Sequence, residues 1–192
     1  MVWRSVTGLF ALGLVAFTIS CRENSSNNGM TPLPRAYARV SVYDSAYRRV
    51  PDAPICFEAN SSASAIYNSV KGWLNVSYPA YGGTLYITVS PASPDTDRLS
   101  AALADRYERM MLNLGDNEAE QIEVTSPQSG AVTTILTSGG AVLTPVQFVS
   151  ACGDRVVSGA FSFCRLPSSA DSVAPLVSAV RRDVLHAAKN LK

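Results

Sequence analysis

Apolar and polar residues alternate along two neighbouring stretches near the middle of the chain, residues 72–79 and 84–90. Such a period of two is typical of strands with one buried face. Pro and Gly residues separate the stretches, which predicts a β-hairpin. A lone hairpin is marginally stable, so its apolar face requires helices packed against it. The residues of that face are Leu74, Val76 and Tyr78 in the first stretch and Leu85, Ile87 and Val89 in the second.

Other stretches with strand character lie on both sides of this hairpin. The last two predict a second hairpin that turns at Gly153–Asp154, because one alternates and a Gly-containing turn separates them. The predicted strands are residues 37–43, 55–59, 63–67, 120–125, 131–137, 146–151 and 156–163.

Two stretches show the three- and four-residue spacing of an amphipathic helix. The first covers residues 97–114, with Asp95 or Thr96 as its N-cap and Gly115 as its stop. The second begins within residues 168–172 and runs close to the C-terminus, with Pro175 in its first turn. The order strands, helix, strands, helix predicts an α+β fold: a single-domain antiparallel sheet with two main helices packed on it as a sandwich.

The N-terminal residues follow a different pattern. Arg4 precedes an uncharged, mostly apolar run over residues 6–19, which is short for a membrane span and suits a secretory signal. The run ends in residues 18–21, Thr-Ile-Ser-Cys, which resemble a bacterial lipobox. We therefore predict a lipoprotein signal peptide over residues 1–20 and lipid attachment, including palmitate, at Cys21. An ordinary signal peptide with a chance Cys, or an uncleaved anchor, is the alternative.

The mature chain is then anchored to a membrane by its first residue. Residues 21–34 contain the lipidated Cys and a polar stretch that predicts a flexible tether, and residues 35–192 form the globular domain. Arg22 is not the Asp that retains lipoproteins at the inner membrane of enteric bacteria. The expected location is the outer membrane, facing the periplasm, with the inner membrane as the alternative.

Composition and motifs point away from several classes of function. The chain has 16 Lys and Arg against 15 Asp and Glu, and no clustered basic surface, so a nucleic-acid partner is not expected. Its one histidine, His186, is interpreted as a packed or surface residue, because nothing in the sequence points to a nucleophile and carboxylate beside it. Phosphate-loop and metal-binding motifs are absent from the sequence. We predict no catalytic, cofactor-binding or metal-binding residues, and no enzyme activity.

Three cysteines remain once Cys21 carries lipid, so at most one disulfide forms. Cys152 and Cys164 are twelve residues apart along an extended hairpin arm, about 35–40 Å, which is too far for a bridge. Three buried free thiols are expected, with a Cys56–Cys164 bridge as the alternative.

Two serines lie in short patterns that resemble the O-glycosylation acceptor of Bacteroidetes. Ser45 is the better candidate, because it lies in a stretch that looks like an exposed turn. Ser172 is interpreted instead as a helix cap.

Several short segments form a further pattern along the chain. They are the lipobox at Cys21, residues 31–40 (TPLPRAYARV), residues 56–60 (CFEAN), residues 73–79 (WLNVSYP) with the strand at 84–88, residues 171–175 (DSVAP) and residues 183–186 (DVLH). Together, in their order and spacing, they resemble the gliding motility lipoprotein GldD family of Bacteroidetes across most of residues 31–192.

The resemblance implies a non-catalytic envelope lipoprotein associated with gliding motility and the type IX secretion machinery. Its expected partners are the membrane, through Cys21, and other envelope proteins of that apparatus. Trp73, Tyr78 and Tyr81, around the end of the predicted hairpin, are candidates for a partner surface. The alternative function is an anchored periplasmic protein that binds a small ligand in a pocket between sheet and helix.

Overall fold

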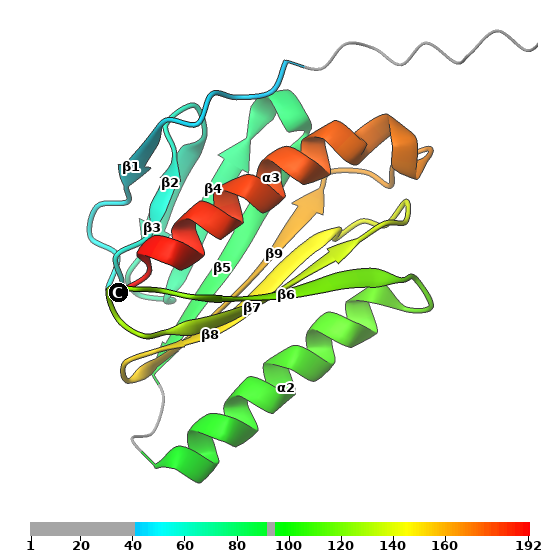
Figure 1. Cartoon of the computed structure of the whole chain (residues 1–192). Helices are drawn as coiled ribbons and strands as arrows, with labels where there is room; N and C mark the ends of the chain where they lie inside the picture. Colours follow the sequence, from blue (N-terminus) through cyan, green and yellow to red (C-terminus); the bar gives the residue numbers. More distant parts are fainter. Residues whose placement is uncertain (1–40, 92–94) are drawn as a thin grey trace, which may run out of the picture. The chain divides into compact units, whose positions relative to one another are not determined.

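A computed structural model describes residues 41–91 and 95–192. The chain divides between Tyr37 and Ala38 into two units, and the described residues belong to the second. Its centre is a seven-stranded antiparallel sheet with the order β3-β4-β5-β9-β8-β7-β6 (Figure 1). The strands are β3 (Ser64–Asn68), β4 (Trp73–Tyr78), β5 (Gly83–Pro91), β6 (Ala119–Thr125), β7 (Val132–Ser138), β8 (Val146–Cys152) and β9 (Arg155–Phe163).

The two predicted hairpins, β4–β5 and β8–β9, are confirmed and lie side by side in this sheet. In the first, Leu74 is paired with Ile87 and Val76 with Leu85, so the apolar residues of both strands share one face. The two hairpins join where β5 pairs with β9 along nine residues. This long central pairing makes one continuous sheet out of two locally encoded hairpins.

The turn of the first hairpin contains a short 3-10 helix, η1 (Pro79–Tyr81). Gly82 follows it with a φ of 62°, a left-handed conformation that favours glycine. Its N–H donates a hydrogen bond to the carbonyl of Pro79, which closes the turn. The tight turn places Tyr78 and Tyr81 beside each other at one end of the hairpin.

The two helices, α2 (Thr96–Leu114) and α3 (Ala170–Asn190), cover opposite faces of the sheet (Figure 1). Helix α2 packs on β8 and β9, and α3 contacts strands from β6 to β8 on the other face. Apolar residues separate accordingly into two clusters, a large one under α3 and a small one under α2. The predicted α+β class, a single-domain antiparallel sheet with two main helices, is confirmed.

Helix α2 has the predicted ends. Asp95 is the N-cap, and its side chain accepts a hydrogen bond from the N–H of Asp97 at 3.1 Å. Gly115 is the C-cap, and its N–H donates to the carbonyl of Leu112. Met110 is buried against the sheet, whereas Met111, on the solvent side of the same helix, is 45% exposed.

The start of α3 corrects two predictions. Ser169 is the N-cap and accepts a hydrogen bond from the N–H of Ser172 at 3.3 Å, so Ser172 is not the cap. Pro175 is the sixth residue of α3 and lies inside the helix rather than in its first turn. Its side chain is exposed, so the ring meets solvent and not the sheet.

A small two-stranded sheet, β1 (Tyr47–Arg49) and β2 (Glu58–Asn60), lies on the α3 side of the main sheet (Figure 1). Of the predicted strand 55–59, only Glu58 and Ala59 belong to a strand, β2. Ile55 and Phe57 are buried, but the N–H of Cys56 donates to the carbonyl of Lys192. This contact with the C-terminal residue takes the place of a strand pairing.

The predicted strand over residues 37–43 is wrong for its described part. Residues 41–46 are irregular, and residues 37–40 lie outside the described range. The backbone N–H and C=O of Tyr43 bond to side chains of distant residues, and so are not available to a neighbouring strand.

Within residues 41–91 and 95–192, no helix combines the length and the apolar character that crossing a membrane requires.

Candidate functional site

The described domain begins at a stack of three tyrosines. Tyr43 lies against Tyr81, with ring centroids 4.7 Å apart, and Tyr81 lies against Tyr78 at 5.4 Å. The three rings are close to parallel, and Phe161 meets Tyr78 edge-on at 5.9 Å. Residue 43 is thus packed onto the hairpin end and the core beneath it.

Hydrogen bonds hold the backbone of this first segment from several directions. The N–H of Tyr43 donates to the hydroxyl of Tyr81 at 2.7 Å, and Arg182 Nη2 donates to the carbonyl of Tyr43 at 2.9 Å. Asn60 Nδ2 donates to the carbonyl of Asp44 at 2.9 Å. We call the residues that hold this segment the N-terminal clamp: Tyr43, Asn60, Tyr81, Arg182 and also Tyr78, whose ring stacks on those of Tyr43 and Tyr81.

A buried carboxylate supports the clamp from below. Asp183 is 3% exposed, and its Oδ1 accepts hydrogen bonds from the hydroxyl of Tyr47 at 3.0 Å and from Asn60 Nδ2 at 3.4 Å. Arg182 Nη2 lies 3.5 Å from the same oxygen. A buried charge is costly unless it is paired and hydrogen-bonded. These contacts satisfy Oδ1, whereas Oδ2 is buried without a hydrogen-bond partner among the described residues.

The pKa values of the surrounding groups reflect this setting. Burial raises the pKa of Tyr78 far above its ordinary range, and the negative charge of Asp183 raises it further. Burial and Asp183 also raise the pKa of Tyr47. Burial lowers the pKa of Arg182, but the charge of Asp183 and the interactions with Tyr47 together outweigh burial and raise the pKa overall. The tyrosines are therefore neutral hydrogen-bonding groups, and Arg182 remains a cation.

His186 contributes to the same group of contacts beneath the clamp. Its ring stacks on Tyr47 with centroids 3.6 Å apart, and its Nε2 lies 2.6 Å from Glu58 Oε2. Asn190 Nδ2 is 3.2 Å from the same nitrogen. The imidazole connects the C-terminal helix to β2, which agrees with its interpretation as a packed residue.

The structure separates the three residues predicted as a partner surface. Tyr78 is 1% exposed and Tyr81 4%, so both are packing residues of the clamp and not a contact surface. Trp73 is 47% exposed, at the other end of β4 and on its opposite face. The Lys71 ammonium lies 4.8 Å from the centroid of its ring. The predicted surface groups these aromatic residues because they are close in the sequence. Side chains alternate between the two faces along a strand, so Trp73 and Tyr78 lie on different faces.

Cys21, Ser45 and Ser172 are the other residues that the sequence singled out for modification or capping. Cys21 lies outside the described residues. Ser45 is exposed, in the irregular segment that follows Tyr43, so it is accessible for the predicted glycosylation. The Ser172 hydroxyl is instead engaged, because it donates to the carbonyl of Ser169 at 2.7 Å.

The cysteines Cys56, Cys152 and Cys164 are free. Cys164 is exposed and Cys56 is half-buried, which corrects the expectation that all three are buried. Cys152 is buried, and burial raises the pKa of its thiol.

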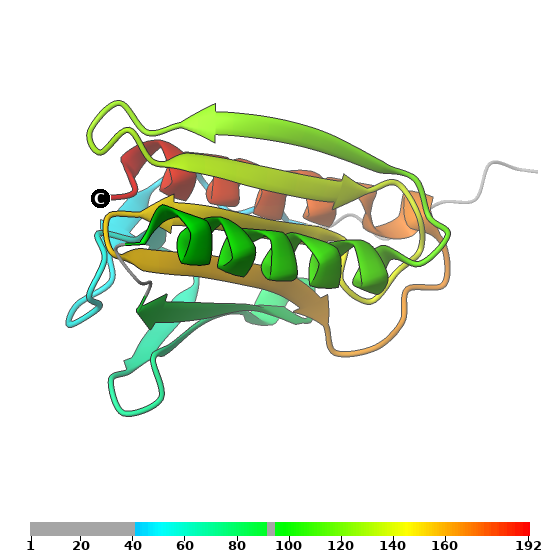
Figure 2. The same cartoon turned by 90° about the horizontal axis from the view of Figure 1, so that it is seen from below.

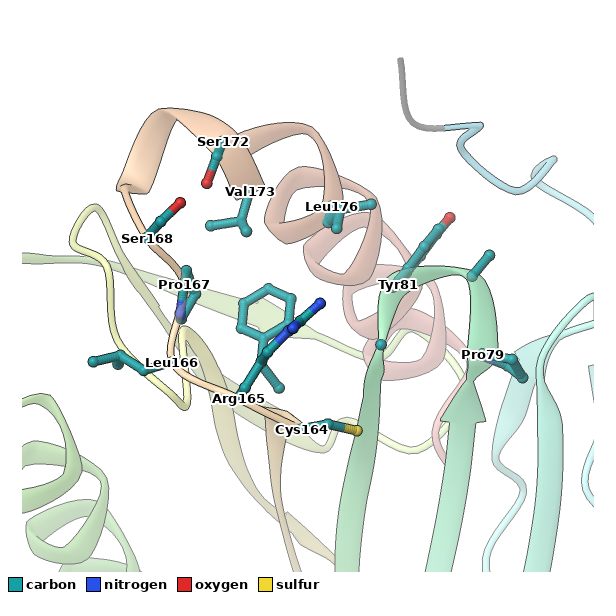
Figure 3. A pocket seen from close by; sticks show the side chains of 13 residues that line it. Pro79, Tyr81, Cys164, Arg165, Leu166, Pro167, Ser168, Ser172, Val173 and Leu176 are labelled. Atoms are coloured by element: carbon teal, nitrogen blue, oxygen red, sulfur yellow. The ribbon is translucent and has the colours of Figure 1, made fainter. Parts of the chain in front are cut away.

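A hollow of about 860 Å³ lies next to the clamp (Figure 3). Val173 and Leu176 of α3 form one side, and the connection from β9 to α3 forms the other. Arg165 in that connection points into the hollow, and Cys164 faces the hairpin (Figure 3). Arg165 is exposed, so the hollow is a surface feature at the end of the sheet, not an enclosed cavity between sheet and helix.

The sequence contained a signal for the clamp that its interpretation missed. Asp183 is a charged residue on the apolar face of the last helix, three positions after Val180 and one before Val184. A carboxylate at such a position requires buried partners. Those partners, Tyr47 and Asn60, are more than 120 residues away in the sequence and could not be named from spacing.

A model of the gliding motility lipoprotein GldD family matches residues 27–192. The chain belongs to this family. Membership identifies it as a gliding motility lipoprotein and confirms the resemblance found in the sequence. The segments that carry the resemblance to the GldD family also meet in the structure: Asn60, Tyr78 and Asp183, from three of them, come together at the clamp.

The chain matches no curated protein sequence. Among solved structures it is similar to cyanobacterial PsbP (CyanoP) from Synechocystis, with 16% sequence identity and a TM-score of 0.44. That similarity covers 77% of this chain and 95% of the other.

Proposed function

We propose that this GldD-family lipoprotein is a non-catalytic component of the gliding motility and type IX secretion machinery. Lipid on Cys21 anchors it, at the outer membrane facing the periplasm, and the domain holds another envelope protein in place. The clamp connects the anchored segment to the folded domain. The observation that carries this proposal is the fixation of Tyr43 by side chains from the hairpin and from the C-terminal helix.

The spacing between anchor and clamp suits a tethered domain. Cys21 and Tyr43 are 22 positions apart, so a fully extended chain between them reaches at most about 75 Å. This length sets the greatest distance from the membrane at which the domain stays attached. Among the described residues, Tyr43 is the first whose backbone groups are bonded to distant side chains, so we expect tension in the tether to reach the domain there.

The clamp is built to receive such tension. Arg182 of α3 and Tyr81 of the hairpin end hold the two backbone groups of Tyr43. Force on the chain is passed to two large elements at once, and does not begin by peeling away the short strand β1 (Tyr47–Arg49). This arrangement supports a mechanical or stabilising role.

The chemistry of the clamp also supports a role without catalysis. Asp183, Arg182, Glu58 and His186 are paired with one another or with neighbouring polar groups. Within the described residues, no group of three His, Cys, Asp or Glu side chains is arranged to hold a metal ion. The polar groups at this site hold chain segments together.

The proposal is tested by crosslinking the lipidated protein in its native envelope and identifying the captured proteins by mass spectrometry. We expect other gliding or secretion proteins to be recovered, and to be lost with Cys21→Ala. Cys164→Ala is the matched control, because it replaces an exposed cysteine of the domain and leaves the anchor intact. Failure to capture any partner reproducibly would overturn the interaction role.

The hollow of Figure 3 favours a second candidate function, small-ligand binding. Its volume falls in the range of ligand pockets, and Arg165 and Ser168 add polar groups to apolar walls. Native mass spectrometry of protein extracted from its own envelope provides the test. A bound small molecule that is lost with Arg165→Ala supports this function, and an unliganded mass rejects it.

A further inference from the structure

The face of the sheet under α2 is only half covered. Helix α2 lies over β8 and β9, and Figure 2 shows β5 and β4 to one side of it. Three side chains on the uncovered strands are large and exposed: Ile66 at 69%, Tyr86 at 54% and Trp73 at 47%. We call Ile66, Trp73, Asn75, Tyr86 and Thr88 the bare half-sheet.

Strand register places these residues in one continuous patch. Asn75 is paired with Ile66 on one side and Tyr86 on the other, and Trp73 is paired with Thr88. A groove of about 250 Å³ continues from Tyr86 and Thr88 to the wall of α2, where Arg106 and Arg109 line it. The patch thus has a flat floor of strands and one helical wall.

The dimensions of the bare half-sheet match one additional helix. Three strand spacings separate β9 from β3, or about 14 Å at 4.8 Å each. A helix with its side chains is about 10–12 Å wide, and packed helices lie about 8–10 Å apart. One helix of roughly 13–20 residues therefore fits beside α2 along strands of this length.

The charges around the patch specify the partner. The strands β3, β4 and β5 contain no carboxylate. Lys71 lies over Trp73 on one side, and Arg106 lies on the other. Among the described residues, Arg106 has no ion-pair partner, whereas Arg109 is paired with Asp105 at 3.0 Å. Two cations thus border a floor with three large exposed apolar or aromatic side chains, which is complementary to acidic residues flanking an apolar stripe.

We propose that the bare half-sheet binds an acidic amphipathic helix of a partner protein in the envelope. A second copy of this chain fits less well, because a symmetric contact would bring Arg106 and Lys71 against the same cations. A flat lipid surface would leave the groove beside α2 unfilled. This inference rests on the proposed function, since it specifies where and how the anchored domain holds its partner.

The proposal is tested by photo-crosslinking in living cells from benzoylphenylalanine placed at position 86 or 73. Position 111 is the matched control, because Met111 is as exposed as Trp73 and lines neither groove beside α2. We expect positions 86 and 73, but not 111, to capture an acidic amphipathic segment of another envelope protein. A synthetic peptide of that segment should then bind the purified full-length protein.

Charge reversal sharpens the test. Arg106→Glu should weaken peptide binding about tenfold, as expected for a like charge placed in a complementary interface. Arg98→Glu, at the exposed start of α2, should leave binding unchanged. Circular dichroism and thermal unfolding of each variant should match the unaltered protein, because these residues lie on the surface.

Each other outcome is informative. A crosslink to lipid, to a second copy or to a segment without acidic residues would overturn the acidic-helix proposal and leave the proposed function intact. The absence of any crosslink from positions 86 and 73 would also overturn the acidic-helix proposal. It would leave the proposed function intact if the envelope pull-down still recovers gliding proteins. Loss of partners in both experiments would overturn the proposed function as well.

Discussion

The two faces of strand β4 (Trp73–Tyr78) have opposite environments. Leu74, Val76 and Tyr78 are almost fully buried under α3 and the clamp, whereas Trp73 and Asn75 face solvent beside α2. The same backbone therefore supports an internal attachment on one side and an unoccupied surface on the other. An antiparallel sheet permits this because it can be covered on one face only. We interpret the covered face as the one that holds the N-terminal segment of the domain, and the bare face as the one that contacts a partner protein.

Substitution of one aromatic residue on each face tests this comparison with the largest expected effect. Tyr78→Ala should lower the free energy of unfolding by about 3–5 kcal/mol, because it leaves a cavity and removes the centre of the tyrosine stack. Trp73→Ala, in the same strand, should change it by less than about 1 kcal/mol. Urea denaturation of the two variants measures the difference. Equal losses would contradict the assignment of the faces.

Removal of the carboxylate beneath the clamp is expected to have a similar but smaller effect. Asp183→Ala should cost about 3 kcal/mol, because it leaves the cation of Arg182 and the hydroxyl of Tyr47 without their buried partner. Asp171→Ala is the control, since Asp171 is an exposed residue of the same helix. Chemical denaturation gives both values. A stable Asp183→Ala protein would show that the carboxylate does not support the clamp.

The raised pKa of Tyr78 predicts a smaller effect that appears only at high pH. Unfolded chains lose the tyrosine proton near pH 10, whereas the folded protein retains it at Tyr78. The stability that the raised pKa of Tyr78 adds to the folded protein is therefore fully present below pH 10. It is lost as the pH rises above 10. Stability should fall by about 1 kcal/mol more in the unaltered protein than in Tyr78→Phe between pH 10 and 11. Parallel pH profiles would show that Tyr78 titrates normally.

Local patterns in the sequence were sufficient for most of the fold. The hairpins were predicted because alternation and turn residues are encoded within about twenty positions, and α2 (Thr96–Leu114) because Asp95 and Gly115 mark its ends. The predicted order of elements also led to the correct fold class. These features depend on interactions between near neighbours, which a sequence displays directly.

The clamp was not predictable in the same way. Tyr43 lies in an apolar-polar alternation that favours a strand, but its backbone is bonded to Tyr81 and Arg182 instead. The second of these contacts spans 139 positions. Tyr78 and Tyr81 were interpreted as surface residues because the sequence does not show that Tyr43 covers them. Long-range contacts of this kind decide which aromatic residues are exposed.

The central claim is that the clamp fixes the anchored end of the chain to the domain, and single-molecule pulling tests it most directly. Handles attached at position 21 and position 86 apply tension along the path from the anchor to the bare half-sheet. We predict that the unaltered domain resists until it unfolds as a unit, and that Tyr43→Ala adds an early extension step at a lower force. Identical force traces for the two proteins would contradict the claim.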